Sequence, residues 1–201
     1  SGTNTFDGGI EDAAGTLRLA SNGAAGLGSI TTTGSVIDYG AGVNNAAPII
    51  LNSNTTQLQV TSSATQSGVI SEISGPRPLE KIGNGVLTMT AANTYTGTTT
   101  ISAGRIILSG AGEILGNVHI ANDTPNDFFE ISKSSNFTYG GVISGYNVAL
   151  SGSGTTTWTG ANTHAYTGIT DGTLTFSGAG TLGASNTWVL MSGGTVDLNG
   201  T

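Results

Sequence analysis

Residues Leu79–Gly116 read LEKIGNGVLTMTAANTYTGTTTISAGRIILSGAGEILG, and this stretch decides the fold. Short runs at 86–90, 98–101 and 105–108 alternate apolar with polar residues, and turns containing Gly or Asn separate them. Alternation with a period of two is typical of a strand that buries one face. Gly or a β-branched residue also interrupts every window of about ten residues, which disfavours a helix anywhere in the chain. The sequence therefore predicts an all-β fold.

Two other parts of the chain repeat this text. Each copy contains an Asn-Thr turn, then a Gly followed by a strand-like run, then a Leu-Gly pair. The turns begin at Asn4, Asn93 and Asn162, and the landmarks recur after 88–89 residues in the first step and 67–69 in the second. Constant order and spacing indicate an internal repeat, with copies near 4–28, 79–116 and 148–183.

The links between the copies repeat as well and reveal one insertion. Gly-Val-Ile-Ser occurs at 68–71 and at 141–144, and a Gly-x-Gly turn follows each occurrence. The first passage is four residues longer, and SGPRP at 74–78 is the expected insertion. Because proline cannot donate a hydrogen bond to a strand ladder, we expect 74–78 to form a loop that leaves the coil.

Short strands at regular spacing suit a sandwich, a barrel or a solenoid, and the long repeat favours the solenoid. One coil of three short strands cannot bury its own apolar face, so the next coil must cover it. At about 20–25 residues per coil, roughly eight to ten coils are expected. Asn93 and Asn162 are expected at tight corners with left-handed backbone, bonding along the axis. Trp158 and Trp188 are expected in the core or stacked on a face.

Composition excludes several classes of protein. The net charge is −7, from 12 Asp and Glu against five Lys and Arg, and the basic residues are scattered. This balance argues against binding to nucleic acid or to an anionic membrane surface. The absence of cysteine excludes disulfides, thiolate metal sites and a Cys nucleophile. No window approaches the roughly 18 apolar residues of a membrane helix, and no signal peptide is recognisable.

Residues 85–90, 93–97 and 104–110 closely resemble the passenger-associated repeat of bacterial autotransporters. That motif contains a G-x-L-T-L-T strand, an N-T-Y-T-G turn and an A-G-T-L-x-L-x-G strand. The copy at Asn162 fits with His164-Ala165 inserted before Tyr166, whereas the copy at Asn4 has Phe6-Asp7 where Tyr-Thr is usual.

The resemblance implies that residues 1–201 are a single right-handed parallel β-helix segment of a larger passenger. It implies a bacterial protein that is exposed on the cell surface or secreted. The native chain is expected to continue into an outer-membrane β-barrel, with no membrane insertion by this segment. Members of the family are adhesins, aggregation factors, proteases, esterases and toxins, so the resemblance leaves the activity open.

The chain offers little catalytic chemistry. His119 and His164 are its two histidines, and we expect both to face outward from a strand or loop. No Gly-x-Ser-x-Gly elbow between strand and helix is present. A glycan-acting β-helix enzyme would need clustered carboxylates, for which Glu11-Asp12 and the acidic residues of 122–130 are the candidates. The same loop offers oxygen ligands for calcium, but its spacing matches no calcium-binding motif. No cofactor or metal site is therefore predicted.

Residues 122–130, ANDTPNDFFE with its leading Ala121, form a second expected excursion from the coils and the best candidate for recognition. Phe128 and Phe129 are adjacent, so they cannot both face the core. We take Asp127, Phe128, Phe129 and Tyr139 as candidate binding residues. The leading hypothesis is a non-enzymatic scaffold and adhesion segment that aids secretion and contacts a host-cell surface, a matrix protein, a glycan or itself. The alternatives are a glycan-acting lyase or hydrolase and a mechanical spacer that presents a distal domain.

Overall fold

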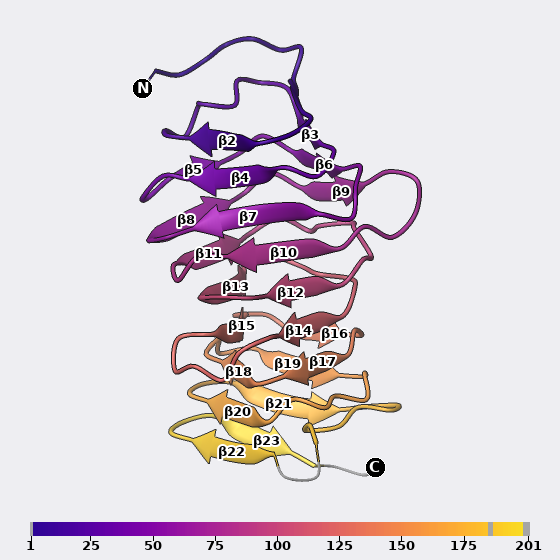
Figure 1. The fold of residues 1–201 in the computed structure, drawn as a ribbon. Helices are drawn as coiled ribbons and strands as arrows, with labels where there is room; N and C mark the ends of the chain where they lie inside the picture. Colours follow the sequence, from indigo (N-terminus) through magenta and orange to yellow (C-terminus); the bar gives the residue numbers. More distant parts are fainter. Residues whose placement is uncertain (1, 185–186, 199–201) are drawn as a thin grey trace.

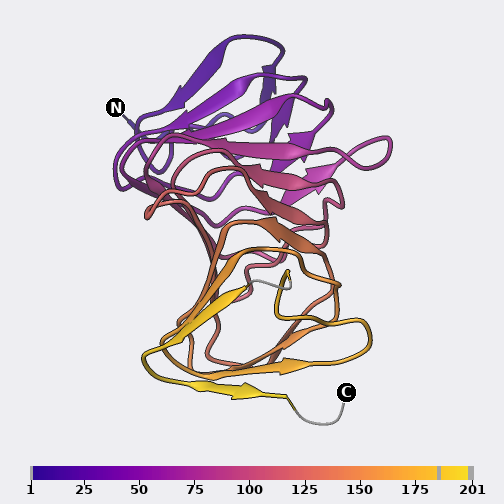
Figure 2. The same ribbon diagram turned by 60° about the horizontal axis from the view of Figure 1, so that its bottom comes forward.

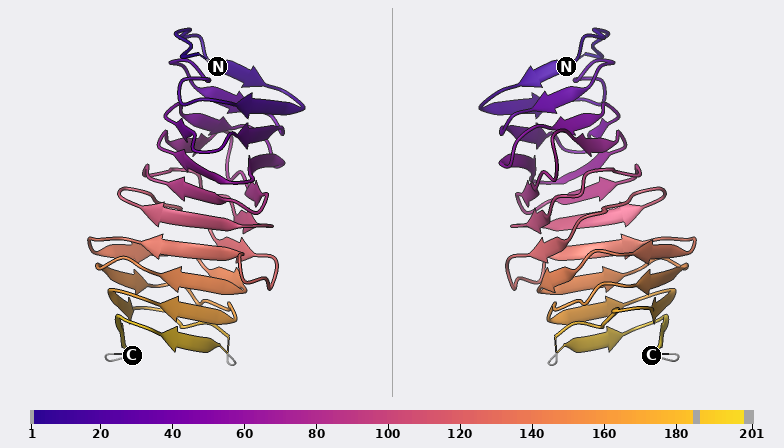
Figure 3. Two further views of the ribbon diagram at one scale, coloured as in Figure 1. Left: turned by 90° about the vertical axis from the view of Figure 1, so that its left-hand side faces the viewer. Right: turned by 90° about the vertical axis from the view of Figure 1, so that its right-hand side faces the viewer.

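The computed structural model describes residues 2–184 and 187–198, and within these ranges it contains no helix. Short parallel strands stack into a β-solenoid of about nine turns, with the two ends of the chain at opposite ends of the stack (Figures 1 and 3). The predicted all-β solenoid of eight to ten coils is thus confirmed. Among the described residues there is no helix long and apolar enough to span a membrane.

The strands form four parallel sheets, and a coil contributes at most one strand to any of them. Sheet 1 contains β1 (Ile10–Asp12), β3 (Ile30–Thr32), β6 (Ile49–Leu51) and β9 (Ile70–Glu72). Sheet 2 contains β2 (Thr16–Leu19), β4 (Val36–Tyr39), β7 (Thr56–Val60), β10 (Leu79–Ile82), β12 (Thr99–Ile101), β14 (Val118–Ile120) and β17 (Ile143–Gly145). Sheet 3 contains β5 (Asn44–Asn45), β8 (Ser63–Gln66), β11 (Val86–Met89), β13 (Arg105–Ser109), β15 (Phe128–Ser132), β18 (Asn147–Leu150), β20 (Tyr166–Ile169) and β22 (Trp188–Met191). Sheet 4 contains β16 (Phe137–Tyr139), β19 (Thr155–Trp158), β21 (Thr173–Phe176) and β23 (Thr195–Asp197).

Sheets 1 and 4 take the same place in the coil. In the N-terminal coils the chain visits sheets 1, 2 and 3 in turn. In the C-terminal coils sheet 4 follows sheet 3 and precedes the segment at Thr163, whose backbone N–H donates to Ile143 of sheet 2. The solenoid therefore has three sides, and one coil takes between 18 residues (Thr155 to Thr173) and 25 residues (Val118 to Ile143).

Inward-pointing side chains form continuous ladders along the stack. In sheet 3, Leu87, Ile106, Phe129 and Val148 pair in register, and all four are buried. The residue two places along each strand is buried too, because alternate residues of a strand share a face. Burial of each apolar side chain of this size contributes about 1.5–3 kcal/mol to the free energy of folding, relative to leaving it exposed. Stacking between coils, as expected, supplies the core that no single coil has.

The length of the sequence repeat is not a whole number of coils. The strand that follows the turn in each copy lies in a different sheet: Thr16–Leu19 in sheet 2, Arg105–Ser109 in sheet 3 and Thr173–Phe176 in sheet 4. Val86 stacks through two intervening coils on Asn147, 61 residues later, whereas its repeat equivalent Thr155 comes after 69. The extra eight residues carry the copy one side further around the solenoid. The same repeated sequence can therefore form a strand on any of the three sides of the solenoid.

The side chains of the two turn asparagines form hydrogen bonds along the solenoid axis, as expected. Their backbones, however, are not in the left-handed conformation. Oδ1 of Asn93 accepts from the N–H of Ile70, and Oδ1 of Asn162 accepts from the N–H of Ile143, both at 2.8 Å. Both isoleucines belong to the repeated Gly-Val-Ile-Ser segments. Each asparagine turn therefore contacts the Gly-Val-Ile-Ser segment of the preceding coil. Within the described residues, Ser74 is the one non-glycine residue with positive φ, so the left-handed conformation predicted for the asparagines is wrong.

The two tryptophans lie in different environments. Trp158 is fully buried, as predicted. Trp188 is 78% exposed, because it pairs in register with Tyr166 and therefore takes the same outward-facing position on sheet 3. The prediction of a core position is therefore wrong for Trp188.

Candidate binding sites at the two interruptions of the repeat

The first interruption is the loop 73–78 between β9 and β10, which projects beside β9 (Figures 1 and 2). Ser74 and Gly75 both have positive φ, which turns the chain sharply outward. Glu72 fastens the base of the loop: Oε2 accepts from the Arg77 N–H at 2.7 Å, and Oε1 accepts from the Thr96 hydroxyl at 2.6 Å. Although burial opposes the charge, these hydrogen bonds lower the pKa of the Glu72 carboxyl below its usual value.

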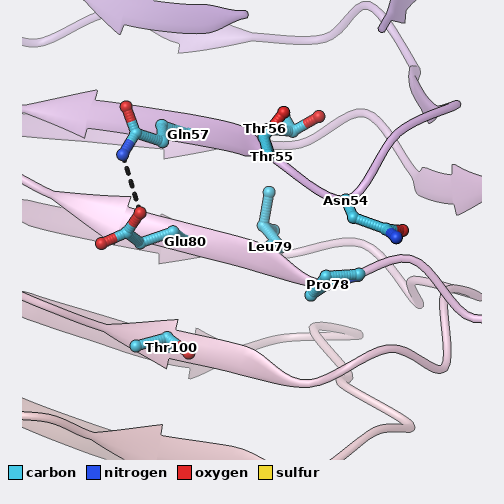
Figure 4. A pocket seen from close by; sticks show the side chains of 8 residues that line it. All are labelled: Asn54, Thr55, Thr56, Gln57, Pro78, Leu79, Glu80 and Thr100. Atoms are coloured by element: carbon cyan, nitrogen blue, oxygen red, sulfur yellow. Dashed lines mark hydrogen bonds between the residues drawn. The ribbon is translucent and has the colours of Figure 1, made fainter. Parts of the chain in front are cut away.

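A hollow of about 390 Å³, the first hollow, lies beside this loop on the outer side of sheet 2. Glu80 is its central charged group, and Gln57 donates to Glu80 Oε2 at 2.7 Å (Figure 4). The Ser102 hydroxyl donates to the other oxygen of Glu80 at 2.5 Å. A single carboxylate held by two neutral donors is a fixed acceptor for a ligand, but it is not the pair of carboxylates that glycoside hydrolysis uses. The lining residues are Asn54, Thr55, Thr56, Gln57, Pro78, Leu79, Glu80 and Thr100.

The second interruption is shorter than the range 122–130, because Phe128–Glu130 already belongs to β15 and the loop ends at 127. Asp127 is buried at its end, and Oδ1 accepts from the Gly104 N–H at 2.5 Å. Asn147 holds the same loop from the following coil, since Nδ2 donates to the carbonyls of Thr124 and Asp127 at 3.0 and 3.2 Å. The predicted binding residue Asp127 therefore fastens the loop to the coil.

The structure does not bring the three predicted aromatic residues together on the surface. Phe129 and Tyr139 are buried and pack on each other, with ring centroids 5.7 Å apart. The Tyr139 hydroxyl donates to the Gly116 carbonyl, and burial raises the pKa of Tyr139. Phe128 is half-buried on the outer face, where the Arg105 guanidinium lies 4.9 Å from its ring centroid. Phe128 is thus the candidate that can meet a ligand.

A second hollow, of about 330 Å³, lies against this loop and Phe128. It is lined by Asp123, Thr124, Pro125, Phe128, Asn147 and Tyr166. Tyr166 was not among the sequence candidates. The signal that could have found it is the insertion His164-Ala165, which displaces this tyrosine from the position that Tyr95 holds in the central copy.

His164 is fully buried, so its predicted outward orientation is wrong. Alternation from the buried Asn162 directs it inward, just as alternation from Asn93 directs Tyr95. Nε2 of His164 lies 2.7 Å from the Thr167 hydroxyl, and the ring meets Trp158 edge to face at 5.3 Å. Burial lowers the pKa of His164 to about 4, so the imidazole is neutral at pH 7.

The remaining acid–base candidates do not converge. His119 is exposed, and Nδ1 lies 3.0 Å from the Ser144 hydroxyl, but no described carboxylate bonds to the ring. Glu11 and Asp12 are adjacent in β1, so they point to opposite faces, and Asp12 is buried against the Ser35 hydroxyl. Across the described ranges, no three His, Asp or Glu side chains gather as a metal ion would require.

Two buried lysines were not foreseen. Lys81 occupies an inward position of sheet 2 between Leu58 and Ile101, and Nζ donates to the carbonyls of Ile82, Gly83 and Ala103. Burial lowers its pKa to about 8, although the Asp127 carboxylate opposes this shift. Lys133 acts similarly on the carbonyls of Gly110 and Gly112. Both amines satisfy turn carbonyls and are closed off from a substrate.

Comparison with known proteins identifies the repeat. Residues 79–108 match the family model described as passenger-associated-transport-repeat. The chain is 30% identical over 194 residues to the Adhesin BmaC autotransporter of Brucella suis biovar 1 (strain 1330). That alignment covers 84% of this chain but 6% of the relative, so the chain spans a small part of that protein's length. No solved structure matches the chain. The predicted resemblance to autotransporter passengers with such repeats is confirmed.

Proposed function

Since the chain carries the transport repeat of autotransporter passengers, we propose that it is a non-enzymatic β-helical segment of a surface passenger that supports attachment or aggregation. The observation that carries this proposal is how the carboxylates on the outer face are used. Glu80 bonds Gln57 and Ser102, and Glu130 bonds Arg105 and Ser151, each from one coil to the next. These groups hold neighbouring coils together, whereas a hydrolase would need them to converge on one scissile bond.

The relative supports the same proposal, because its name describes an adhesin and its alignment covers most of this chain. An adhesin needs an extended surface that stays folded outside the cell, and a stack of coils with a continuous core supplies one. We place the protein at the bacterial cell surface or in the secreted fraction, exported by the type V route. The two hollows at the interruptions are the surfaces proposed to meet a partner.

A bead assay tests the proposal. Beads coated with the 201-residue chain would be applied to cultured host cells, to immobilised matrix proteins and to beads of the same kind. Attachment to at least one of these surfaces above that of beads carrying an unrelated acidic protein is expected. Failure on all three surfaces, or turnover of a glycan, ester or peptide substrate by the purified chain, would contradict it.

A further inference from the structure

The second hollow has the composition of a small-molecule site on the outside of sheet 3. Phe128, Asn147 and Tyr166 occupy the same register position in β15, β18 and β20, which stack directly on one another (Figure 1). With strands about 4.8 Å apart, the two aromatic residues stand roughly 10 Å apart with the amide between them. Neither ring packs against the hydrophobic core, and both are half-exposed. One face of the Phe128 ring carries the Arg105 guanidinium, so a ligand would meet the remaining exposed part of that ring together with the exposed part of the Tyr166 ring.

Three polar groups of the hollow still have unused hydrogen-bonding capacity. Within residues 2–184 and 187–198, no group bonds to the Asp123 carboxylate, the Tyr166 hydroxyl or Oδ1 of Asn147. Both N–H groups of the Asn147 amide are engaged by the loop carbonyls, so the direction of its Oδ1 is set before any ligand arrives. A site with convergent polar groups and apolar walls is the usual plan of a ligand pocket, and about 330 Å³ is at the small end of the usual size.

We propose that the second hollow binds a neutral saccharide unit, with Phe128 and Tyr166 as the apolar walls. A sugar ring offers C–H groups to aromatic faces and hydroxyl groups to a carboxylate, an amide oxygen and a phenol, which matches all the groups present. This inference rests on the proposed attachment function and names its ligand class.

Charge selects a neutral ligand over its alternatives. The Asp123 carboxylate and a net charge of −7 disfavour an anionic sugar. A cationic ligand is disfavoured because the Phe128 ring already carries the Arg105 guanidinium, which is itself paired with Glu130 at 2.9 Å. The loop 121–127 lines one side of the hollow with Asp123, Thr124 and Pro125.

The test is ligand-observed NMR and calorimetry on the purified chain. The neutral probes are lactose, mannotriose and the trimer of N-acetylglucosamine, and the charged probes are sialyllactose and choline. At least one neutral probe is expected to bind with a Kd of about 1 mM, which corresponds to about −4 kcal/mol. Phe128→Ala and Tyr166→Ala should each weaken it by about tenfold or more.

Controls separate a lost site from a lost fold. Phe6→Ala removes an exposed aromatic ring on the first coil and should leave the affinity unchanged. Tyr166→Phe keeps the ring and removes the hydroxyl, so it should weaken binding less than Tyr166→Ala while the unfolding midpoint stays constant. The proposal would be overturned if no neutral probe bound, if charged probes alone bound, or if Phe128→Ala and Tyr166→Ala both kept the affinity of the wild type. A saccharide that binds to a chain whose beads adhere to nothing would leave this inference standing and remove the attachment function.

Discussion

Two corners of the solenoid use the same sequence motif to different ends. The first corner, Asn93–Gly97, reads NTYTG, and the second, Asn162–Gly168, reads NTHAYTG. In both, the asparagine bridges the coil before and the coil after, and the residue two places on points inward. That inward residue is Tyr95 in the first corner and His164 in the second.

The difference shows what an insertion does to a strict alternation. Tyr95 is fully buried, and its hydroxyl lies 2.7 Å from that of Thr99. In the second corner His164 takes the interior place and its bond to a threonine, while Tyr166 comes to the outer face and lines the second hollow. Two added residues therefore exchange a core group for a surface group without disturbing the bridge made by asparagine.

Truncating the two tyrosines separates these roles most strongly. Tyr95→Ala should cost about 3–5 kcal/mol, because it leaves a cavity in the core and removes a partner of Thr99. Tyr166→Ala should cost less than about 1 kcal/mol, because its side chain is half-exposed and lies outside the core. Urea unfolding followed by circular dichroism measures both. Equal losses of stability would mean that the two tyrosines occupy equivalent places.

Acid should act on the core of the second corner through His164, a titrating interior residue that the first corner lacks. The pKa of His164 is about 4 in the folded chain, whereas an exposed histidine of the unfolded chain has a pKa of 6.5. As the pH falls, the unfolded chain therefore takes up the proton first. The stability from the neutral imidazole is present above pH 6.5 and is lost between pH 6.5 and 4, by about 3 kcal/mol. The loss is obtained from urea unfolding at several pH values, as the difference between the wild type and His164→Gln. A difference that is independent of pH would contradict the buried neutral histidine.

The asparagine bridges should be worth the same at both corners. Asn93→Ala and Asn162→Ala each leave a buried isoleucine N–H and a carbonyl of the next coil without partners, at about 1–3 kcal/mol. Thr94→Ala and Thr163→Ala, at the exposed neighbouring positions, are the matched controls and should be near neutral. Thermal unfolding compares the four variants. A large effect at one corner alone would break the equivalence of the bridges.

The smallest expected effect concerns Glu72, which supports only the first corner, since Gly145 holds its place in the later phrase. Glu72→Gln should cost about 1 kcal/mol or less, because the side chain is only partly buried and Gln keeps one oxygen that can accept some of the same hydrogen bonds. Amide exchange at Arg77 and Thr96 should become faster. Because hydrogen bonds lower the pKa of this carboxyl, its contribution is present above pH 4.5 and is lost as the pH falls through the lowered value. Unchanged exchange at neutral pH would show that Glu72 does not fasten the loop.

The alternation and the repeat were enough to predict the solenoid and much of its core. Leu58 and Val60, Leu87 and Met89, and Ile106 and Leu108 all point inward, as their period-two pattern predicts. A solenoid core is local in sequence, because each strand's alternation directly decides which residues the next coil covers.

The binding surface could not be predicted in the same way. Which of Phe128 and Phe129 faces outward depends on where the loop ends and β15 begins, and that point is set by the bonds from Asp127 to Gly104 and from Asn147 to the loop. The buried Lys81 is a similar case, since a polar residue at an inward position is acceptable only because three turn carbonyls lie within reach. Contacts between coils decide both, and no single stretch of sequence contains them.

Chemical labelling of the tyrosines in the folded chain tests the exchange between the two corners most directly. Nitration followed by peptide mass spectrometry should modify Tyr166 rapidly and leave Tyr95 protected until the chain unfolds, because one ring is half-exposed and the other is fully buried. Protection of Tyr166, or modification of Tyr95 at the same rate, would contradict the exchange of a core group for a surface group.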